Sequence, residues 1–255
     1  MLESTPMDSL HSAADNRLSF RDAGGQGAIV FDPAHLRQAT PALFEPTGFG
    51  DTVKPVTGDG GRGAAWFVHG EFGEAVLRQY RRGGLAARLS SDAYLWRGET
   101  QVRSFREFHL LRRFRELGLP VPTPYAACYR QRGGCYKAAI LVARITGARS
   151  FAAQVASAPS QAPWTVVGST IAQFHRQGAH HSDLNAHNVL LDGDDAVWLI
   201  DWDKGRQENS AGPWCARVLA RLQRSLHKQC PDVAASELDQ GMRLLHAAHD
   251  RALAA

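Results

Sequence analysis

The sequence contains few cysteines and no long hydrophobic run. Its 255 residues include four cysteines, which form no C-x-x-C pair and are too few to staple a domain of this size, so reduced thiols are expected. No His and Cys stand at the spacing of a zinc site, and no zinc is predicted. There is no run of 18 apolar residues, so no membrane-spanning helix is predicted. The start of the chain lacks the basic and then apolar layout of a secretory signal, and a cytoplasmic protein is expected.

Lysine is also scarce, because 25 of the 29 basic residues are arginine. Ten arginines and three acids lie between positions 76 and 115, which gives this stretch a local charge of +7. Arginine forms forked contacts with carboxylates and phosphates, so the stretch predicts an anionic partner such as nucleic acid, anionic lipid or ATP. A solvated basic face in an arginine-rich composition is the alternative. Nucleic acid is disfavoured, because the phenylalanines here lie in a helical core stripe and do not alternate with the basic residues as exposed rings.

The most informative segment is residues 180–205, which read HHSDLNAHNVLLDGDDAVWLIDWDKG. In it two apolar runs flank a turn cluster of Asp and Gly, which predicts a β-hairpin. A hairpin brings its outer ends together, so Asn188 and Asp201 should lie side by side, with Asp183 on the loop that precedes them. Three oxygen-bearing side chains at one sheet edge suit a hard cation such as Mg²⁺, shared with substrate phosphates. The alternative is a hairpin with solvated acids at its ends.

The spacing within this segment matches the catalytic loop of kinases. The pattern H-x-D-L-x-x-x-N ends at Asn188, and in kinases its Asp accepts the proton of the substrate hydroxyl while its Asn binds metal. The Asp-Trp-Asp run that begins at Asp201 stands where kinases carry the metal-binding Asp-Phe-Gly, and it differs in the last two positions. The sequence therefore predicts Asp183 as the catalytic base and Asn188 and Asp201 as ligands of Mg²⁺.

A glycine-rich stretch upstream predicts a loop over nucleotide phosphates. Gly58, Gly60 and Gly63 fit G-x-G-x-x-G, and two apolar runs joined by a Gly-containing turn follow. The order strand, turn, strand is that of the kinase loop over ATP, whereas a helix after the glycines would indicate a dinucleotide fold. Kinases carry a Lys on the next strand. Here Arg78 stands in that place and is the predicted phosphate-binding cation, with an exposed strand arginine as the alternative.

A helix with an acid beside its apolar stripe is predicted next. Residues 100–117 repeat apolar side chains about every three positions, and Gly118 ends the pattern. Glu107 is the only acid of this helix before its last turn. It is the natural ion-pair partner for Arg78, although it can also serve to neutralise the neighbouring arginines.

The order of elements predicts an α+β, bilobal, protein-kinase-like fold, with a small β-rich N-lobe containing one helix and a mostly helical C-lobe. The first thirty or so residues are expected to form a loose arm. The predicted divisions are an N-terminal arm at 1–50, weakly structured in part, an N-lobe at 51–145 and a C-lobe at 146–255. Further expected elements are a strand at 136–145, a hinge turn at Thr146 and Gly147, a helix from Trp164 to Gly178, and helices at 214–230 and 237–255.

The runs HSDLNAHN, DWDKG and VLRQYRRGG together resemble the 3-deoxy-D-manno-octulosonic acid (Kdo) kinases of Gram-negative bacteria, a family of lipopolysaccharide-core sugar kinases with a protein-kinase-like fold. The resemblance extends from about Gly58 to Gly205. It implies ATP-dependent transfer of phosphate to the 4-hydroxyl of Kdo on a lipid A precursor, at the cytoplasmic side of the bacterial inner membrane. It assigns to Asp183, Asn188 and Asp201 the roles given above.

Several departures from ordinary protein kinases put a peptide substrate in doubt, namely Arg78 in place of Lys, Asp203 in place of the Gly of Asp-Phe-Gly, and the lack of an Ala-Pro-Glu segment. Another core sugar such as heptose is an alternative acceptor. Cationic acceptors such as aminoglycosides and choline are disfavoured by the arginine-rich stretch. A nucleotide-binding or anionic-lipid-binding pseudokinase is the alternative from another class, but all three predicted active-site residues are present.

The resemblance also implies partners. A Kdo-lipid A precursor carries a sugar carboxylate and glucosamine phosphates on an anionic bilayer, so a basic patch would hold the headgroup and attach the enzyme peripherally. Arg81, Arg82 and Lys204 are the predicted acceptor contacts. ATP and Mg²⁺ are the expected cofactors, and neither nucleic acid nor a stable protein partner is predicted.

Overall fold

The structure of the protein is a computed structural model that describes residues 16–56, 65–81 and 93–255. The chain divides into two compact units. The first unit is formed by Met1–Arg112 and Thr123–Arg144, and the second by Arg113–Pro122 and Ile145–Ala255.

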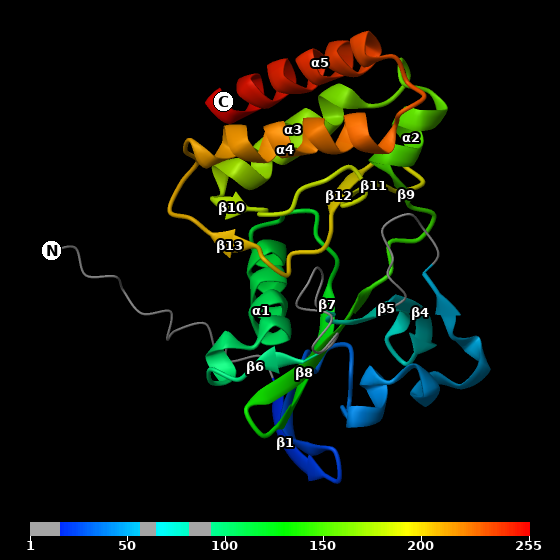
Figure 1. The fold of residues 1–255 in the computed structure, drawn as a ribbon, viewed down its shortest axis with the longest axis vertical. Helices are drawn as coiled ribbons and strands as arrows, with labels where there is room; N and C mark the ends of the chain where they lie inside the picture. The colour runs from blue at the N-terminus through cyan, green and yellow to red at the C-terminus, as the bar shows by residue number, and fades with distance from the viewer. Residues whose placement is uncertain (1–15, 57–64, 82–92) are drawn as a thin grey trace, which may run out of the picture. The chain divides into compact units, whose positions relative to one another are not determined.

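The first unit is built on an antiparallel sheet, drawn from blue to green in Figure 1. Its strands follow the order β1-β2-β7-β8-β5-β4-β3, and β6 pairs with β8. The strands are β1 (Asn16–Asp22), β2 (Gly25–Phe31), β3 (Lys54–Pro55), β4 (Ala65–Gly70), β5 (Gly73–Gln79), β6 (Tyr94–Leu95), β7 (Pro124–Arg132) and β8 (Cys135–Ala143). Short 3-10 helices are η1 (Pro41–Phe44), η2 (Pro46–Thr52) and η4 (Glu99–Gln101).

Residues 16–31 correct the expectation of a loose arm over the first thirty or so residues. They form the hairpin β1–β2, and β2 also pairs with β7. The four apolar residues from Ala28 to Phe31 are buried. An uninterrupted apolar run of this length is typical of a strand covered on both faces. The Ser, Ala, Asp and Gly content of the first thirty residues indicates a loose arm. The apolar run within it nevertheless forms a strand, because it can be buried against β7.

Strands β4 and β5 form the predicted strand, turn and strand, with Ala65 opposite Arg78. Gly73 begins β5 at a φ of 82°, in the left-handed region that favours glycine. On its other side β5 pairs with β8, where Arg78 lies opposite Ile140. Arg78 is therefore fixed on an inner strand.

The predicted helix is α1 (Arg103–Glu116), which follows η4 directly. Its apolar stripe is buried as expected, with Phe108 and Leu111 almost fully covered. Two contacts tie the start of the helix to β7: Ser104 donates to the carbonyl oxygen of Cys128 at 2.9 Å, and the ring of Phe105 meets that of Tyr129 edge-on at 5.3 Å. Glu107, one turn after the helix start, is thereby held next to the sheet.

The second unit is mainly helical, drawn from green to red in Figure 1. Its short strands form a pair, β10 with β13, and a three-stranded sheet in the order β12-β11-β9. Its helices are α2 (Phe151–Ser157), α3 (Trp164–Arg176), α4 (Trp214–Gln229) and α5 (Ala235–Ala254). Its strands are β9 (Arg149–Ser150), β10 (Ala179–His180), β11 (Val189–Leu191), β12 (Val197–Leu199) and β13 (Arg206–Gln207).

Helices α3 and α5 pack closely through glycines. A Cβ on Gly168 of α3 would lie 2.2 Å from the carbonyl oxygen of Leu245, and a Cβ on Gly241 of α5 would lie 2.2 Å from the Trp164 ring. Such distances are far below van der Waals contact, so each helix needs glycine where the other crosses it. Of this pair, α3 also contacts the short strands β10 and β12.

The sequence prediction placed α1, α3, α4, α5, β8 and the β11–β12 hairpin correctly, and the α+β class is confirmed. It did not anticipate β1, β2, β7 or α2. No helix within the described residues is long and apolar enough to cross a membrane.

Candidate active site

The hairpin of β11 and β12 sets the positions of Asn188 and Asp201. The two strands pair with Val189 opposite Leu199. The ladder continues by one step, because the backbone N–H of Ile200 donates to the carbonyl oxygen of Asn188 at 3.0 Å. Asn188 and Asp201 therefore stand at the same end of the hairpin, as the sequence predicts.

At the other end of the hairpin, Asp192 closes the turn. Its carboxylate accepts the backbone N–H groups of Asp194 and Ala196 at 3.0 and 2.9 Å and the indole N–H of Trp198 at 2.8 Å. These hydrogen bonds, that of Trp198 above all, lower the pKa of Asp192. Asp192 therefore has a structural role in the turn.

The loop before the hairpin is held by side-chain amides. The Nδ2 groups of Asn185 and Asn188 both donate to the carbonyl oxygen of Asp183 at 3.1 Å. The Oδ1 of Asn185 accepts the backbone N–H groups of His187 and Asn188 at 3.0 and 3.2 Å. Asn188 is buried, and its Nδ2 is occupied, so its Oδ1 is the atom that can ligate a cation.

His181 is buried and uses both ring nitrogens. Its Nε2 lies 2.9 Å from the carbonyl oxygen of Ile200, and its Nδ1 accepts the backbone N–H of Asp183 at 3.2 Å. Burial lowers the pKa of His181, so the ring is neutral, and the carbonyl acceptor assigns its proton to Nε2. His181 thus ties the backbone of Asp183 to the residue that precedes Asp201, and it is a positioning residue.

Asp201 has a left-handed backbone, with a φ of 63°. For a residue with a Cβ this conformation costs about 1–2 kcal/mol, and the neighbouring tryptophan holds it in place. Trp202 is fully buried and donates its indole N–H to the carbonyl oxygen of Leu199 at 3.0 Å. Its ring stacks on Phe174 at 5.4 Å and meets Phe114 at 4.7 Å. Trp202 therefore fills the core, while Asp201 is exposed.

Helix α4 contacts the loop that carries Asp183 at two points. The guanidinium of Arg221 forms an ion pair with the carboxylate of Asp183. One turn further, the hydroxyl oxygen of Ser225 accepts the backbone N–H of Ala186 at 3.0 Å. The Asp183 side chain remains 42% exposed. It is therefore held by a cation and still open to a substrate.

In the first unit, Arg78 and Glu107 pair as the sequence predicts. The Nη2 of Arg78 lies 2.6 and 2.5 Å from the two carboxylate oxygens of Glu107. Glu107 is 2% exposed, and the Tyr80 hydroxyl also donates to it. The guanidinium lies over the Tyr80 ring at 4.9 Å. A buried carboxylate needs such partners, and they fix the direction of Arg78.

The structure does not test the other predicted site residues. Arg81 and Lys204 are exposed, and their contact with an acceptor stays a prediction. Four predicted residues lie outside the described part of the chain, namely Gly58, Gly60, Gly63 and Arg82.

Sequence reasoning assigned no role to His181, Asn185, Tyr80 or Arg221. Tyr80 could have been found, because alternate residues of a strand share a face, and Tyr80 is two positions from Arg78. His181 and Asn185 stand inside the catalytic pattern, but the pattern does not say which backbone groups they bind. Arg221 is 38 residues from Asp183, and no local signal connects them.

The residues present fit a magnesium ion. The amide Oδ1 of Asn188 and the carboxylate of Asp201 are hard oxygen donors at the same end of one hairpin. No cluster of three or more His, Cys, Asp or Glu side chains suited to a metal occurs within the described ranges. Mg²⁺ is commonly held by one or two protein side chains together with phosphates and water, so two protein oxygens are sufficient.

The residue types that phosphoryl transfer uses are present in each unit: the second has a fixed and exposed carboxylate and two oxygen donors for a hard cation, and the first has a strand arginine oriented by a helical glutamate. The α+β fold and these residue types together indicate a phosphotransferase.

Comparison with known proteins identifies the family. Residues 50–242 match the model of the Lipopolysaccharide kinase (Kdo/WaaP) family. The 3-deoxy-D-manno-octulosonic acid kinase of Xanthomonas campestris pv. campestris is 48% identical over 233 residues, which cover 91% of this chain and 93% of the relative. The enzyme of that name from Stenotrophomonas maltophilia is 49% identical over 232 residues, with the same shares covered. The chain belongs to the Kdo/WaaP lipopolysaccharide kinase family.

A solved structure, that of WaaP in complex with acyl carrier protein, is more distantly similar. It has a TM-score of 0.45 and 15% sequence identity, and the match covers 79% of this chain and 87% of that chain.

Proposed function

We propose that the protein transfers the γ-phosphate of ATP to the 4-hydroxyl of the Kdo residue on a Kdo-lipid A precursor. The observation that supports this most is the network in which His181, Asn185 and Asn188 fix the backbone of Asp183 and of the residue before Asp201. The identity to relatives named 3-deoxy-D-manno-octulosonic acid kinase supports the choice of acceptor.

In this mechanism Asp183 orients the sugar hydroxyl and accepts its proton as the oxygen attacks the γ-phosphorus. The new bond forms between the sugar oxygen and the γ-phosphorus, and the bond to the bridging oxygen of ADP breaks. Arg78, held by Glu107 and Tyr80, neutralises phosphate charge. Asn188 and Asp201 would hold Mg²⁺, which supplies charge neutralisation at the phosphate oxygens when bound. Most of the catalytic effect is positioning of the reactants.

We further propose that the enzyme acts at the cytoplasmic side of the bacterial inner membrane as a peripheral protein, because its acceptor is a membrane lipid and its cationic residues favour an anionic surface. More protein should sediment with anionic than with neutral vesicles at low salt. Equal sedimentation with both would contradict electrostatic attachment.

The proposed activity is tested by transfer of labelled γ-phosphate from magnesium ATP to two acceptors, a lipid A precursor bearing one Kdo and the same precursor without Kdo. Label on the Kdo form alone is expected. Label on neither acceptor, with ATP still bound, would reject Kdo and direct the search to heptose-bearing acceptors. A protein that neither binds ATP nor transfers label would contradict the proposed function as a whole.

A further inference from the structure

Helix α4 presents a row of cations on one face. Arg217, Arg221, Arg224 and Lys228 follow one another at intervals of four, three and four residues. At about 3.6 residues per turn, they lie within an arc of about 60° and extend over about 16 Å. We call these four residues the α4 stripe. The opposite face of the helix is buried and apolar, with Val218, Leu219, Leu222 and Leu226 among its members.

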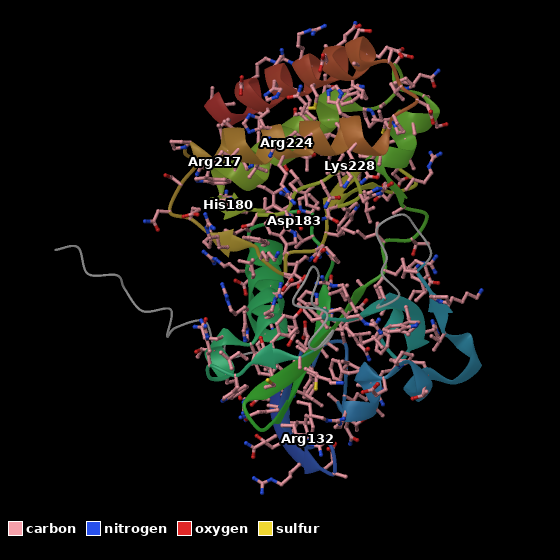
Figure 2. All side chains as sticks on the ribbon, in the orientation of Figure 1. Arg132, His180, Asp183, Arg217, Arg224 and Lys228 are labelled. Atoms are coloured by element: carbon pink, nitrogen blue, oxygen red, sulfur yellow. The ribbon has the colours of Figure 1, made fainter. Side chains whose placement is uncertain are left out.

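The positive charge of the α4 stripe is only partly neutralised by acidic side chains of the described residues. All four side chains are exposed. Arg221 pairs with Asp183, but Arg217, Arg224 and Lys228 form no ion pair with any residue in the described ranges of the chain. The helix itself contains no Asp or Glu. Figure 2 labels these three cations along α4, with Asp183 beside the helix.

The position of the stripe is fixed relative to the catalytic loop. The ring of Trp214, at the start of α4, stacks on His180 at 4.5 Å with an angle of 11° between the planes. Further along the helix, Ser225 accepts the N–H of Ala186. The loop is therefore tied to α4 on both sides of Asp183. A ligand bound at the middle of the stripe lies beside Arg221, whose guanidinium contacts the catalytic carboxylate.

Several arginines of residues 76–115, the stretch expected to face an anionic partner, are engaged with the protein, whereas the predicted acceptor contact Arg81 is exposed. Arg78 pairs with Glu107, and Arg113 pairs with Glu116. Arg103 lies over the ring of Tyr94 at 4.8 Å. Arg217, Arg224 and Lys228, which form no ion pair with a described residue, are thus more available to an anion than Arg78 or Arg103.

We infer that the α4 stripe binds the phosphate groups of the lipid acceptor and guides its sugar hydroxyl to Asp183. This inference rests on the proposed function and deepens it by naming the surface that recognises the acceptor. Guanidinium and ammonium groups suit phosphate oxygens, and the span of about 16 Å allows contact with more than one anionic group. Arg221, at the carboxylate of Asp183, marks the end of this path at the reacting hydroxyl.

The test compares two triple variants that each remove three exposed cations. The stripe variant carries Arg217→Gln, Arg224→Gln and Lys228→Gln. The control variant carries Arg132→Gln, Arg243→Gln and Arg251→Gln, which are exposed and form no ion pair with any described residue. Both lose the same charge, so an effect of net charge alone appears in both. Equal melting temperatures would show that both variants are folded.

The acceptor is supplied in micelles of a nonionic detergent, so that no anionic bilayer contributes. The KM for the phosphorylated acceptor is expected to rise about tenfold or more in the stripe variant, because three exposed cations no longer attract the acceptor phosphates. The KM for ATP and all constants of the control variant should stay unchanged. For an acceptor without lipid A phosphates, the wild-type protein should already have a high KM. The three substitutions of the stripe variant should raise this KM little further.

Equal KM values in the stripe and control variants would overturn the inference. An unchanged KM in micelles, together with lost binding to anionic vesicles, would also overturn it and assign the stripe to the membrane surface. Equilibrium binding of a fluorescent acceptor without ATP separates this inference from the proposed function. Stripe-dependent binding without phosphate transfer would support the stripe and contradict the activity.

Discussion

Asp183 combines a fixed backbone with an exposed side chain. Its carbonyl oxygen accepts two amide hydrogen bonds and its N–H donates to His181, while its carboxylate remains 42% exposed. Catalysis by positioning requires both properties, because the base must be held in place and still reach the substrate. At the scale of single residues, the most specific predictions therefore concern Asp183 and Asp201.

The first prediction concerns proton transfer. Asp183→Asn keeps the shape of the side chain but cannot accept a proton, so kcat should fall by about two orders of magnitude or more, with the affinity for ATP retained. Asp194→Asn, on the exposed hairpin turn, is the control and should keep normal turnover. Steady-state kinetics and calorimetric ATP binding measure both. Near-normal turnover of Asp183→Asn would show that another group is the base.

The second prediction separates strain from metal binding at Asp201. Asp201→Gly and Asp201→Ala both remove the carboxylate, and both should lose magnesium-dependent nucleotide binding. Only glycine adopts a φ near 63° without penalty, so Asp201→Gly should be more stable than Asp201→Ala by about 1 kcal/mol.

The matched control is Asp195, which has a φ of 58° on the far turn of the hairpin. The same order of stability is expected for its Gly and Ala variants in urea unfolding, with nucleotide binding intact. Unchanged nucleotide affinity in both Asp201 variants would argue against a metal ligand at this position.

At the scale of elements, polar side chains link helices and strands that are separate in the sequence. Strand β5 and helix α1 share the cluster of Arg78, Tyr80 and Glu107, in which the carboxylate is almost fully buried. Helices α3 and α5 share a hydrogen bond between His175 and His249, with 2.8 Å between Nδ1 and Nε2. Removing one partner from either cluster leaves a buried polar group, which is costly.

The third prediction tests the coupling of β5 to α1. Arg78→Met removes a guanidinium that pairs with the buried Glu107 carboxylate and should destabilise the protein by about 3 kcal/mol. The double variant Arg78→Met and Glu107→Gln should recover part of this loss. The exposed pair of Arg144 and Glu74 is the control, and Glu74→Gln should cost less than about 1 kcal/mol. Urea unfolding measures all of these variants; additive effects at Arg78 and Glu107 would contradict the coupling.

The fourth prediction concerns pH and the packing of α3 on α5. Burial, with help from the nearby His249 and His180, lowers the pKa of His175 to about 3, against about 6.5 in an unfolded chain. As pH falls below 6.5 the unfolded state takes up this proton and the folded state does not. The contribution of His175 to stability is therefore complete above about pH 6.5 and decreases toward pH 3.

Between pH 7.5 and 5.5 this decrease amounts to about 1 kcal/mol for one such histidine. His175→Gln keeps a donor for His249 but does not titrate, so its stability should depend less on pH by that amount. The control variant, Gln173→Ala on the exposed face of α3, should keep the wild-type pH dependence. Denaturant unfolding at the two pH values provides the comparison, and an unchanged pH dependence in His175→Gln would refute the assignment.

At the scale of the whole molecule, the features that could be predicted from the sequence are those that depend on local patterns of residues. The hairpin of β11 and β12 follows from two apolar runs around an Asp and Gly turn, and the pairing of Arg78 with Glu107 follows from the order of strand and helix. Contacts between distant segments were not predictable. The ion pair of Arg221 with Asp183 and the pairing of β2 with β7 join residues whose meeting depends on packing of the complete unit.

The arginine-rich composition likewise shows what could not be predicted from the sequence alone. Sequence counting placed the anionic partner at residues 76–115, because arginine is most frequent there. The structure shows that several of those arginines are paired or packed on rings, whereas Arg217, Arg224 and Lys228 of α4 are exposed and form no ion pair with a described residue. Charge available to a ligand depends on neighbours in space, which a count along the chain does not include.

The most direct measurement is a single turnover with labelled γ-phosphate and the Kdo-bearing acceptor, followed by mild acid release of the Kdo sugar. The wild-type protein should place the label on released Kdo, at the 4-hydroxyl, and Asp183→Asn should place almost none there in the same time. Label that remains on the lipid A part, or equal labelling of Kdo by both proteins, would contradict transfer to Kdo through Asp183.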